Sequence, residues 1–146
     1  TSKAWAADVA SLEPLAVVSR DEGNLVDAVT AAMGAPHLEV VADVVGGPQF
    51  ADYLALLGPA GRYVTAGAIA GPVVSLDLRT IYLKKLRLYG VSTGYQHHFE
   101  AAVELIRAGR IRPLLARTYP LSEIKQAQTD FMAKGFFGNL VVLPGK

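Results

Sequence analysis

Glycine and other small residues directly follow three apolar runs of the sequence. Gly46-Gly47 follows the run 40–45, Gly67 to Ala70 follows 62–66, and Gly90 to Thr93 spans the end of the run 86–91. Because glycine has no Cβ, its backbone can approach a ligand closely, although glycines at such places also simply turn the chain. The chemistry that these segments offer is binding through backbone groups, not acid, base or nucleophilic catalysis.

Few side chains have the spacing of a catalytic or metal-binding group. His97 and His98 are adjacent, and adjacent helical residues point about 100° apart, so the pair is poorly placed to chelate a metal ion. Asp43 interrupts an apolar run, where it either satisfies a structural role, which we favour, or orients a ribose. Without cysteine the chain has no disulfide, thiolate zinc site or cysteine nucleophile. We therefore predict no metal, no serine-hydrolase chemistry and no identifiable catalytic residue.

The composition is that of one folded domain. The chain has 146 residues, of which 51% are hydrophobic and 18% charged, with a formal net charge of +1. The apolar content excludes disorder of the whole chain, and the absence of a basic excess argues against a nucleic-acid partner. No apolar run approaches the ~20 residues that span a bilayer, so we expect no membrane partner and a cytoplasmic location. The chain starts Thr1-Ser2-Lys3, and we expect a fragment or a processed chain.

The hydrophobic pattern alternates between helical and extended periods. Helical stripes are expected over 5–12, 25–33, 50–57, 77–85, 99–106 and 122–131, and strands over 15–18, 40–45, 62–66, 86–91, 115–119 and 139–143. Such alternation predicts an α/β fold with a mostly parallel sheet and helices on both faces. The run 40–45 has the composition of a strand that is covered on both faces. Ligands bind such sheets at the carboxyl ends of the strands, where the glycine segments lie.

The last fifty residues depart from this pattern. The expected strands 115–119 and 139–143 flank a single helix and have no obvious partner within the chain. We therefore expect them to pair with a domain that is absent from this sequence.

Several segments, taken in order, match one enzyme family. They are VADVVGG at 41–47, LGPAGRYV at 57–64, DLRTIYLK at 77–84, LYG at 88–90, IRP at 111–113, TYPL at 118–121 and FGNLVV at 137–142. Together they resemble the medium-chain dehydrogenase/reductase superfamily, and within it the branch of zinc-type alcohol dehydrogenases and quinone oxidoreductases. The resemblance implies an incomplete Rossmann-like, doubly wound sheet. Residues 1–94 would be a partial nucleotide-binding domain, and 95–146 a strand-helix-strand tail that in the family returns to the catalytic domain.

The sequence departs from the family pattern at several places. The Gly-x-Gly-x-x-Gly turn that presents amides to a pyrophosphate is absent, as is the catalytic domain with any zinc ligands. Leu12-Glu13-Pro14-Leu15 stands where members often have Leu-Gly-Ala-Asp, and Asn139 stands where they have lysine. The chain thus resembles only the carboxyl-terminal part of such an enzyme.

The resemblance implies which residues contact a nicotinamide cofactor. Ser2 and Lys3 correspond to groups near the adenosine 2′-phosphate and Arg20 to a residue against the adenine, so that cations there favour NADP(H), with NAD(H) as the alternative. The competing interpretation is an exposed lysine and a surface arginine. The remaining implied contacts, to the nicotinamide half and the end of the chain, are Val45, Gly46, Gly67, Ala68, Ile69, Ala70, Gly90, Val91, Ser92 and Asn139.

The implied parent protein moves a hydride between NADPH and a carbonyl or activated alkene of a small-molecule substrate. Because its proton donor would lie in the absent domain, we expect residues 1–146 alone to be inactive. The alternative is a non-catalytic α/β module for dimerisation or regulation. In the family the strand matching 86–91 pairs with its twin in a second subunit, and an unpaired edge favours such pairing, so we predict a homodimer.

Overall fold

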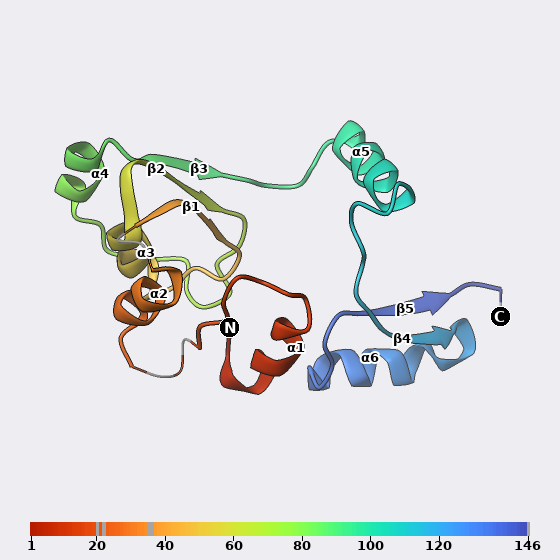
Figure 1. The fold of residues 1–146 in the computed structure, drawn as a ribbon. Helices are drawn as coiled ribbons and strands as arrows, with labels where there is room; N and C mark the ends of the chain where they lie inside the picture. The colour runs from red at the N-terminus through yellow and green to blue at the C-terminus, as the bar shows by residue number, and fades with distance from the viewer. Residues whose placement is uncertain (20, 22, 35–36, 146) are drawn as a thin grey trace. The chain divides into compact units, whose positions relative to one another are not determined.

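The computed structural model describes residues 1–19, 21, 23–34 and 37–145 of the chain, in two compact units, Thr1–Thr93 and Gly94–Lys146 (Figure 1). In the first unit the elements are η1 (Lys3–Trp5), α1 (Ala6–Ala10), α2 (Leu25–Met33), β1 (Leu38–Asp43), α3 (Phe50–Leu56), β2 (Leu57–Thr65), α4 (Leu78–Lys84) and β3 (Arg87–Gly90). In the second they are α5 (Gln96–Arg107), β4 (Leu115–Pro120), η2 (Leu121–Glu123), α6 (Ile124–Ala133) and β5 (Asn139–Leu143). No helix in the described part of the chain is both long and apolar enough to cross a membrane.

The first unit contains a parallel sheet with the strand order β1-β2-β3. Helix α3 connects β1 to β2, and α4 connects β2 to β3. In the register of the ladders, Val41 lies beside Tyr63 and Tyr63 beside Leu88. The predicted α/β class with parallel strands is therefore confirmed.

Helices cover one face of this sheet. Both α3 and α4 contact β2 and each other, because crossovers of one hand that advance in one direction place their helices on the same side. On the opposite face Val40 is 46% exposed and Tyr89 48% exposed. The expectation that β1 is covered on both faces is therefore wrong for the described residues, whereas the predicted α/β architecture of a parallel sheet with helices is confirmed. Helices on two faces need a strand order that reverses, which β1-β2-β3 does not.

The core of the first unit lies between the sheet and these helices. Val41, Phe50, Leu54, Leu57, Tyr63 and Leu86 form one buried cluster. The rings of Phe50 and Tyr63 meet edge to face with their centroids 5.1 Å apart. This contact fixes the start of α3 against the centre of the sheet.

Local signals explain where the helices begin and end. The Asn24 side chain accepts a hydrogen bond from the Asp27 amide at the start of α2, and Gly34 ends this helix in the left-handed conformation at φ 62°. Asp77 caps α4 by accepting from the Arg79 amide. These boundaries agree with the sequence patterns.

The predicted strand 15–18 is absent. Residues 16–19 have no regular secondary structure, and Leu15 is 82% exposed. In place of a ladder, the Val18 carbonyl accepts one hydrogen bond from the Thr1 amino group at 2.9 Å. An apolar run forms a strand only beside another strand, and none lies next to this one in the part of the chain that the structure describes.

The second unit corrects a further expectation. Strands β4 and β5 pair with each other in parallel, with Thr118 beside Val141, and α6 forms the crossover. They do not need a strand from elsewhere to form a ladder. The helix expected over 122–131 is divided into the short helix η2 and α6, and Ser122, a candidate cap in the sequence, makes no side-chain cap.

Candidate functional site

The carboxyl ends of β2 and β3 border a shallow hollow in the first unit. Its volume is about 350 Å³, and it is lined by Thr65, Ala66, Gly67, Ala68, Gly90, Val91 and Ser92. The Val91 amide donates to the Thr65 carbonyl at 2.8 Å, which extends the β2–β3 ladder to the floor of the hollow. The structure thus brings five predicted cofactor-binding residues together, all of them small or contributing mainly backbone.

The turn that follows β1 packs tightly against the loop that follows β2. The Ala66 amide donates to the Asp43 carbonyl and the Ala70 amide to the Val45 carbonyl, both at 2.9 Å. A Cβ on Gly46 would lie 2.9 Å from the Ala68 Cα, and a Cβ on Gly67 would overlap the Val44 carbonyl oxygen. Glycine is therefore required at both positions for the two loops to interlock.

The hydrogen bond between Val45 and Ala70 and the close approach of Gly46 to Ala68 connect three more predicted residues to the loop that lines the hollow. Ile69 belongs to the same loop and is 91% exposed. The sequence did not single out Thr65 and Ala66, which line the hollow directly. Their signal was only that they lie at the end of the predicted strand 62–66.

Asp43 holds the turn after β1 from beneath. Asp43 as a whole is 4% exposed, and its Oδ1 accepts hydrogen bonds from the Val45 amide at 2.8 Å and the Gly46 amide at 2.9 Å. Its Oδ2 accepts a hydrogen bond from the Tyr63 hydroxyl at 2.6 Å. Sequence reasoning noticed Asp43 and missed Tyr63, which shares its face of the sheet.

The two side chains shift each other's ionisation. Burial raises the pKa of Asp43, but hydrogen bonds from Tyr63, Gly46 and Val45 outweigh it, and the pKa lies below the ordinary value. Burial, together with the hydrogen bond to Asp43, raises the pKa of Tyr63 to about 12. At neutral pH the pair is therefore an ionised carboxylate that accepts from a neutral phenol.

The residues expected near the adenosine end lie elsewhere in the first unit. Ser2 precedes η1 and makes no side-chain cap, and the Lys3 backbone amide donates to Asp21 Oδ2 at 2.7 Å. Arg20 lies outside the described residues. The Asp21 carboxylate next to Lys3 was not considered in the sequence analysis.

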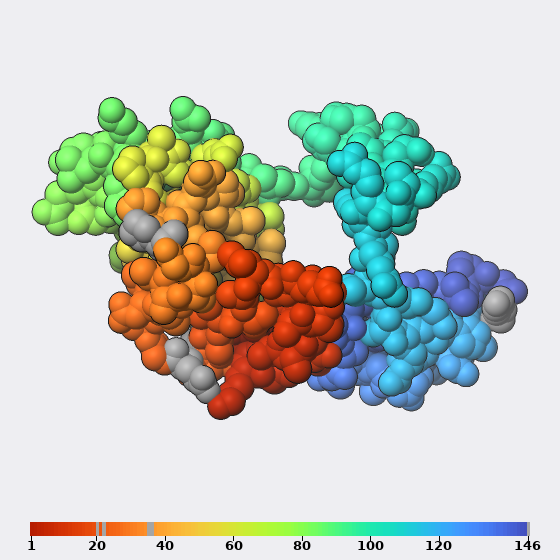
Figure 2. Space-filling model, viewed as in Figure 1, coloured from red at the N-terminus to blue at the C-terminus, as the bar shows by residue number. Residues whose placement is uncertain are grey.

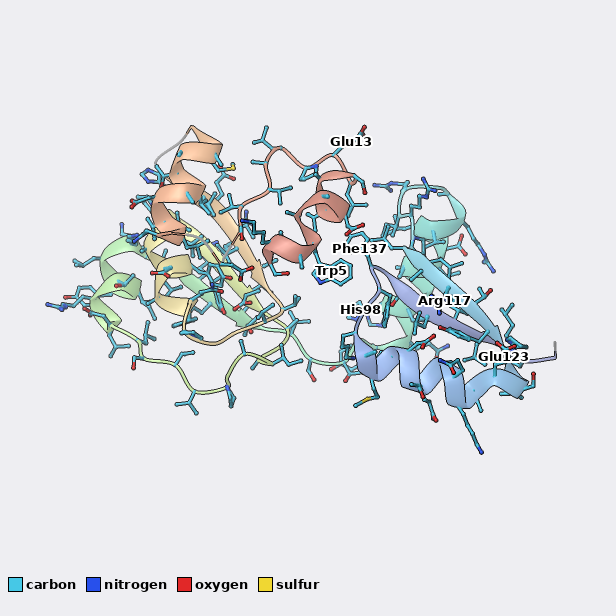
Figure 3. The ribbon with its side chains drawn as sticks, turned by 90° about the horizontal axis from the view of Figure 1, so that it is seen from below. Trp5, Glu13, His98, Arg117, Glu123 and Phe137 are labelled. Carbon is cyan, nitrogen blue, oxygen red and sulfur yellow. The ribbon has the colours of Figure 1, made fainter. Side chains whose placement is uncertain are left out.

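Asn139 belongs to the second unit. Its backbone amide and its side-chain amide both donate to the Leu114 carbonyl, at 2.8 and 3.1 Å, and so start the β4–β5 ladder. In the same unit the hydroxyl of the buried Tyr119 donates to Asp130 at 2.5 Å, and Arg117, labelled in Figure 3, pairs with that carboxylate at 2.8 Å. The two hydrogen bonds to Leu114 give Asn139 a structural role in the β4–β5 ladder.

The histidines and Ser92 have simple structural descriptions. His98, at the start of α5 (Figure 3), accepts a hydrogen bond on Nδ1 from the Tyr95 amide at 3.1 Å. The prediction of no serine-hydrolase chemistry assumed that the Gly-x-Ser-x-Gly pattern is absent, which is wrong, because Gly90 to Gly94 have this spacing. The φ of Ser92 is not left-handed, and in the described ranges no base is hydrogen-bonded to its hydroxyl. The strained nucleophile turn of a serine hydrolase is therefore not formed.

A metal ion finds no ligand set here. Among residues 1–19, 21, 23–34 and 37–145, no three histidine, aspartate or glutamate side chains lie close enough to hold one. Zinc, which the resemblance associates with some relatives, therefore has no ligand set among these residues.

The hollow suits one half of a nicotinamide dinucleotide better than it suits a metal ion. Ligand pockets have volumes of roughly 300–1,000 Å³, so a hollow of about 350 Å³ accommodates one half of a dinucleotide. Its lining of backbone and small side chains allows close approach by a ring and a ribose. The amide-rich turn for the pyrophosphate is absent from the sequence, so the hollow would hold the nicotinamide half alone.

Comparisons with known proteins agree with this architecture. The family model described as a zinc-binding dehydrogenase matches residues 16–142. Quinone oxidoreductase-like protein 2 of Rattus norvegicus is 28% identical over 134 residues, which cover 86% of this chain and 38% of that protein. A crystal structure of a Sinorhizobium meliloti 1021 protein, described as an alcohol dehydrogenase, is 53% identical with a TM-score of 0.87, covering 99% of this chain and 40% of the other.

A more distant structure shares the fold. A crotonyl-CoA carboxylase/reductase in complex with NADP is 21% identical, with a TM-score of 0.84 over 97% of this chain and 41% of the other. The chain thus spans about two fifths or less of the length of these relatives. Since the family model covers most of the sequence, the chain belongs to the zinc-binding dehydrogenase family, within the medium-chain dehydrogenase/reductase superfamily.

Proposed function

We propose that this chain is the nucleotide-binding part of an NADP(H)-dependent oxidoreductase that reduces a carbonyl or an activated alkene. The observation that carries the proposal is the hollow at the ends of β2 and β3, which lies where parallel sheets bind ligands and is bordered by Gly67 and Gly90. Membership of a dehydrogenase family supports hydride transfer, and the name of the quinone oxidoreductase-like relative supports a quinone or related activated alkene as substrate.

The chain's own residues would bind and orient the cofactor. A bound nicotinamide supplies or accepts the hydride. The backbone at 65–68 and 90–92 would border its ring and ribose, and the turn at 44–47 would support the loop 66–70 from the side. We propose no proton donor and expect residues 1–146 alone to show no turnover.

The preference between the two dinucleotides depends on the region around Lys3. A cation there favours the 2′-phosphate of NADPH, whereas a carboxylate favours the free 2′-hydroxyl of NADH. Asp21 accepts from the Lys3 amide, so both charges occur in this region. We retain NADPH as the proposed cofactor, and comparing turnover with NADPH and NADH tests it: equal or better turnover with NADH would remove the preference.

We also propose a homodimer through the free edge of β3. Among the described residues this strand pairs with β2 alone, and all four of its residues are exposed; its segment is coloured green in Figure 2. Successive backbone amides of a strand point to opposite sides. Because the Val91 amide points to Thr65, the Leu88 amide points away from β2, where a carbonyl of a second copy could accept a hydrogen bond from it. The predicted cytoplasmic location stays a prediction.

The decisive experiment uses the full-length protein that the gene encodes. Titration with NADPH and NADH, followed by turnover with a quinone and an α,β-unsaturated acyl-CoA, is expected to show micromolar dinucleotide binding and reduction of one substrate class. Absence of dinucleotide binding would support the alternative, a non-catalytic dimerisation or regulatory module.

A further inference from the structure

A buried pair of side chains lies directly beneath the turn at 44–47. Asp43 is 4% exposed and Tyr63 3% exposed, and both lie on the face of the sheet that α3 covers. Neither side chain lines the hollow, and neither has a role in the proposed function so far.

The pair connects three structural elements. Asp43 ends β1, Tyr63 lies in β2, and the Tyr63 ring packs against Phe50 at the start of α3. The strands are neighbours in the sheet, as Figure 1 shows. A hydroxyl–carboxylate hydrogen bond of 2.6 Å therefore couples the packed core to the end of β1.

The same carboxylate also fixes the turn. Oδ1 accepts the amides of Val45 and Gly46, the two residues whose backbones define the path of the chain over the sheet edge. Gly46 then takes φ 67° and Gly47 φ 84°, conformations that glycine adopts readily. A buried carboxylate with both oxygens engaged is a rigid support, because releasing either partner leaves a buried polar group unsatisfied.

The turn at 44–47 also holds the loop 66–70, which borders the hollow. Val45 accepts from the Ala70 amide, and Gly46 has no room for a Cβ beside Ala68. Movement of the turn must therefore move the backbone of 67–70.

We propose that Asp43 and Tyr63 are positioning residues that set the backbone path of 44–47 and 67–70 for the nicotinamide half of the cofactor. They act through the backbone and do not touch the ligand. This inference rests on the proposed function, because it assumes that a dinucleotide occupies the hollow.

The test measures binding to the full-length protein with two probes. NADPH reaches the hollow, whereas 2′,5′-ADP contains only the adenosine half; NADH and ADP replace them if the protein prefers NADH. Tyr63→Phe removes the hydroxyl and keeps the ring packed on Phe50. We expect the Kd for NADPH to rise about tenfold and that for 2′,5′-ADP to change less than about twofold, since losing one hydrogen bond to a charged group has this order of effect.

A second variant and a control complete the design. Asp43→Asn keeps the shape and one acceptor oxygen, so we expect a rise of about threefold, and the double variant should show less than the product of the two effects. Tyr119→Phe is the matched control, because its hydroxyl also donates to a carboxylate, that of Asp130, but in the second unit. It should leave both Kd values unchanged.

Hydrogen exchange provides an independent readout. The amides of Val45 and Gly46 should exchange faster in Tyr63→Phe and in Asp43→Asn, while those of β2 stay as in the wild type. If Tyr63→Phe lacks a cooperative unfolding transition, Asp43→Asn decides by the same criteria.

Two results would overturn the inference while leaving the proposed function intact. One is an unchanged Kd for NADPH in the variants, with unchanged exchange at 45 and 46. The other is an equal loss of affinity for both probes, which indicates general destabilisation. A wild-type protein that binds neither dinucleotide would instead refute the proposed function, and the inference with it.

Discussion

The Lys84 ammonium group connects α4 to the carboxyl end of α3 through three hydrogen bonds. Its Nζ donates to the carbonyls of Leu54 at 3.2 Å, Ala55 at 2.8 Å and Leu57 at 2.9 Å. These carbonyls lie at the carboxyl end of α3, where a helix leaves its last acceptors unpaired and carries partial negative charge. Leu54 and Leu57 are among the most buried residues, so water does not readily replace the lost donor.

Lys84→Met removes the charge and keeps the length of the apolar stem. Hydrogen bonds to charged groups contribute about 1.5–3 kcal/mol each in buried settings, and partial exposure of Lys84 reduces this, so we expect a loss of about 2 kcal/mol in the free energy of unfolding of the first unit. Hydrogen exchange of the β2 amides measures it, and this loss corresponds to exchange about thirtyfold faster.

The matched control is Lys85→Met, one residue further along. Lys85 is exposed, makes no side-chain hydrogen bond within the described residues and keeps its φ of 55° with either side chain. We expect a change within about 0.5 kcal/mol. If Lys84→Met and Lys85→Met destabilise the unit equally, the three carbonyl contacts do not stabilise it and the reasoning is refuted.

Three further predictions concern the hollow, the sheet edge and pH. Gly90→Ala adds a methyl group that meets no atom within 4 Å, so stability should not change, while the Kd for NADPH should rise about tenfold because the methyl group crowds the hollow. The control Gly135→Ala is equally open and should change neither quantity. An unaltered Kd for Gly90→Ala would contradict cofactor binding at the hollow. Leu88→Pro removes the outward amide of β3 and should convert the proposed dimer to a monomer in sedimentation experiments; a dimer that persists would exclude this edge. Burial and the hydrogen bond to Asp43 raise the pKa of Tyr63 from 10.0 to about 12, so the free energy of unfolding should fall as the pH rises through this range. Urea titrations at several pH values should show a smaller fall for Tyr63→Phe, which lacks the phenol. The same dependence of the free energy of unfolding on pH in both proteins would count against this prediction.

The sequence predicted the elements whose signals are local. The helix 25–33 was bounded correctly because Asn24 and Gly34 act within one turn of its ends. The alternation from β1 to β3 was also recognisable, because each segment carries its own period and each loop its own glycine.

Features that depend on distant partners were missed. The run 15–18 is as apolar as β1 but lacks a neighbouring strand in the described residues, so its composition misled. The pairing of β4 with β5 and the bond between Asp43 and Tyr63 join residues about twenty positions apart, and their register follows from the assembled sheet. Exposure of one sheet face follows from the strand order, which the periodicity of single segments does not encode.

We propose that the strand ends of the first unit bind a nicotinamide dinucleotide. Hydrogen exchange of the full-length protein with and without saturating NADPH tests it most directly, because it reports which backbone segments the ligand covers. Protection is expected at 44–47, 65–70 and 90–93, and not at β4 or β5. Protection confined to other segments, or none at all despite saturation, would contradict the account.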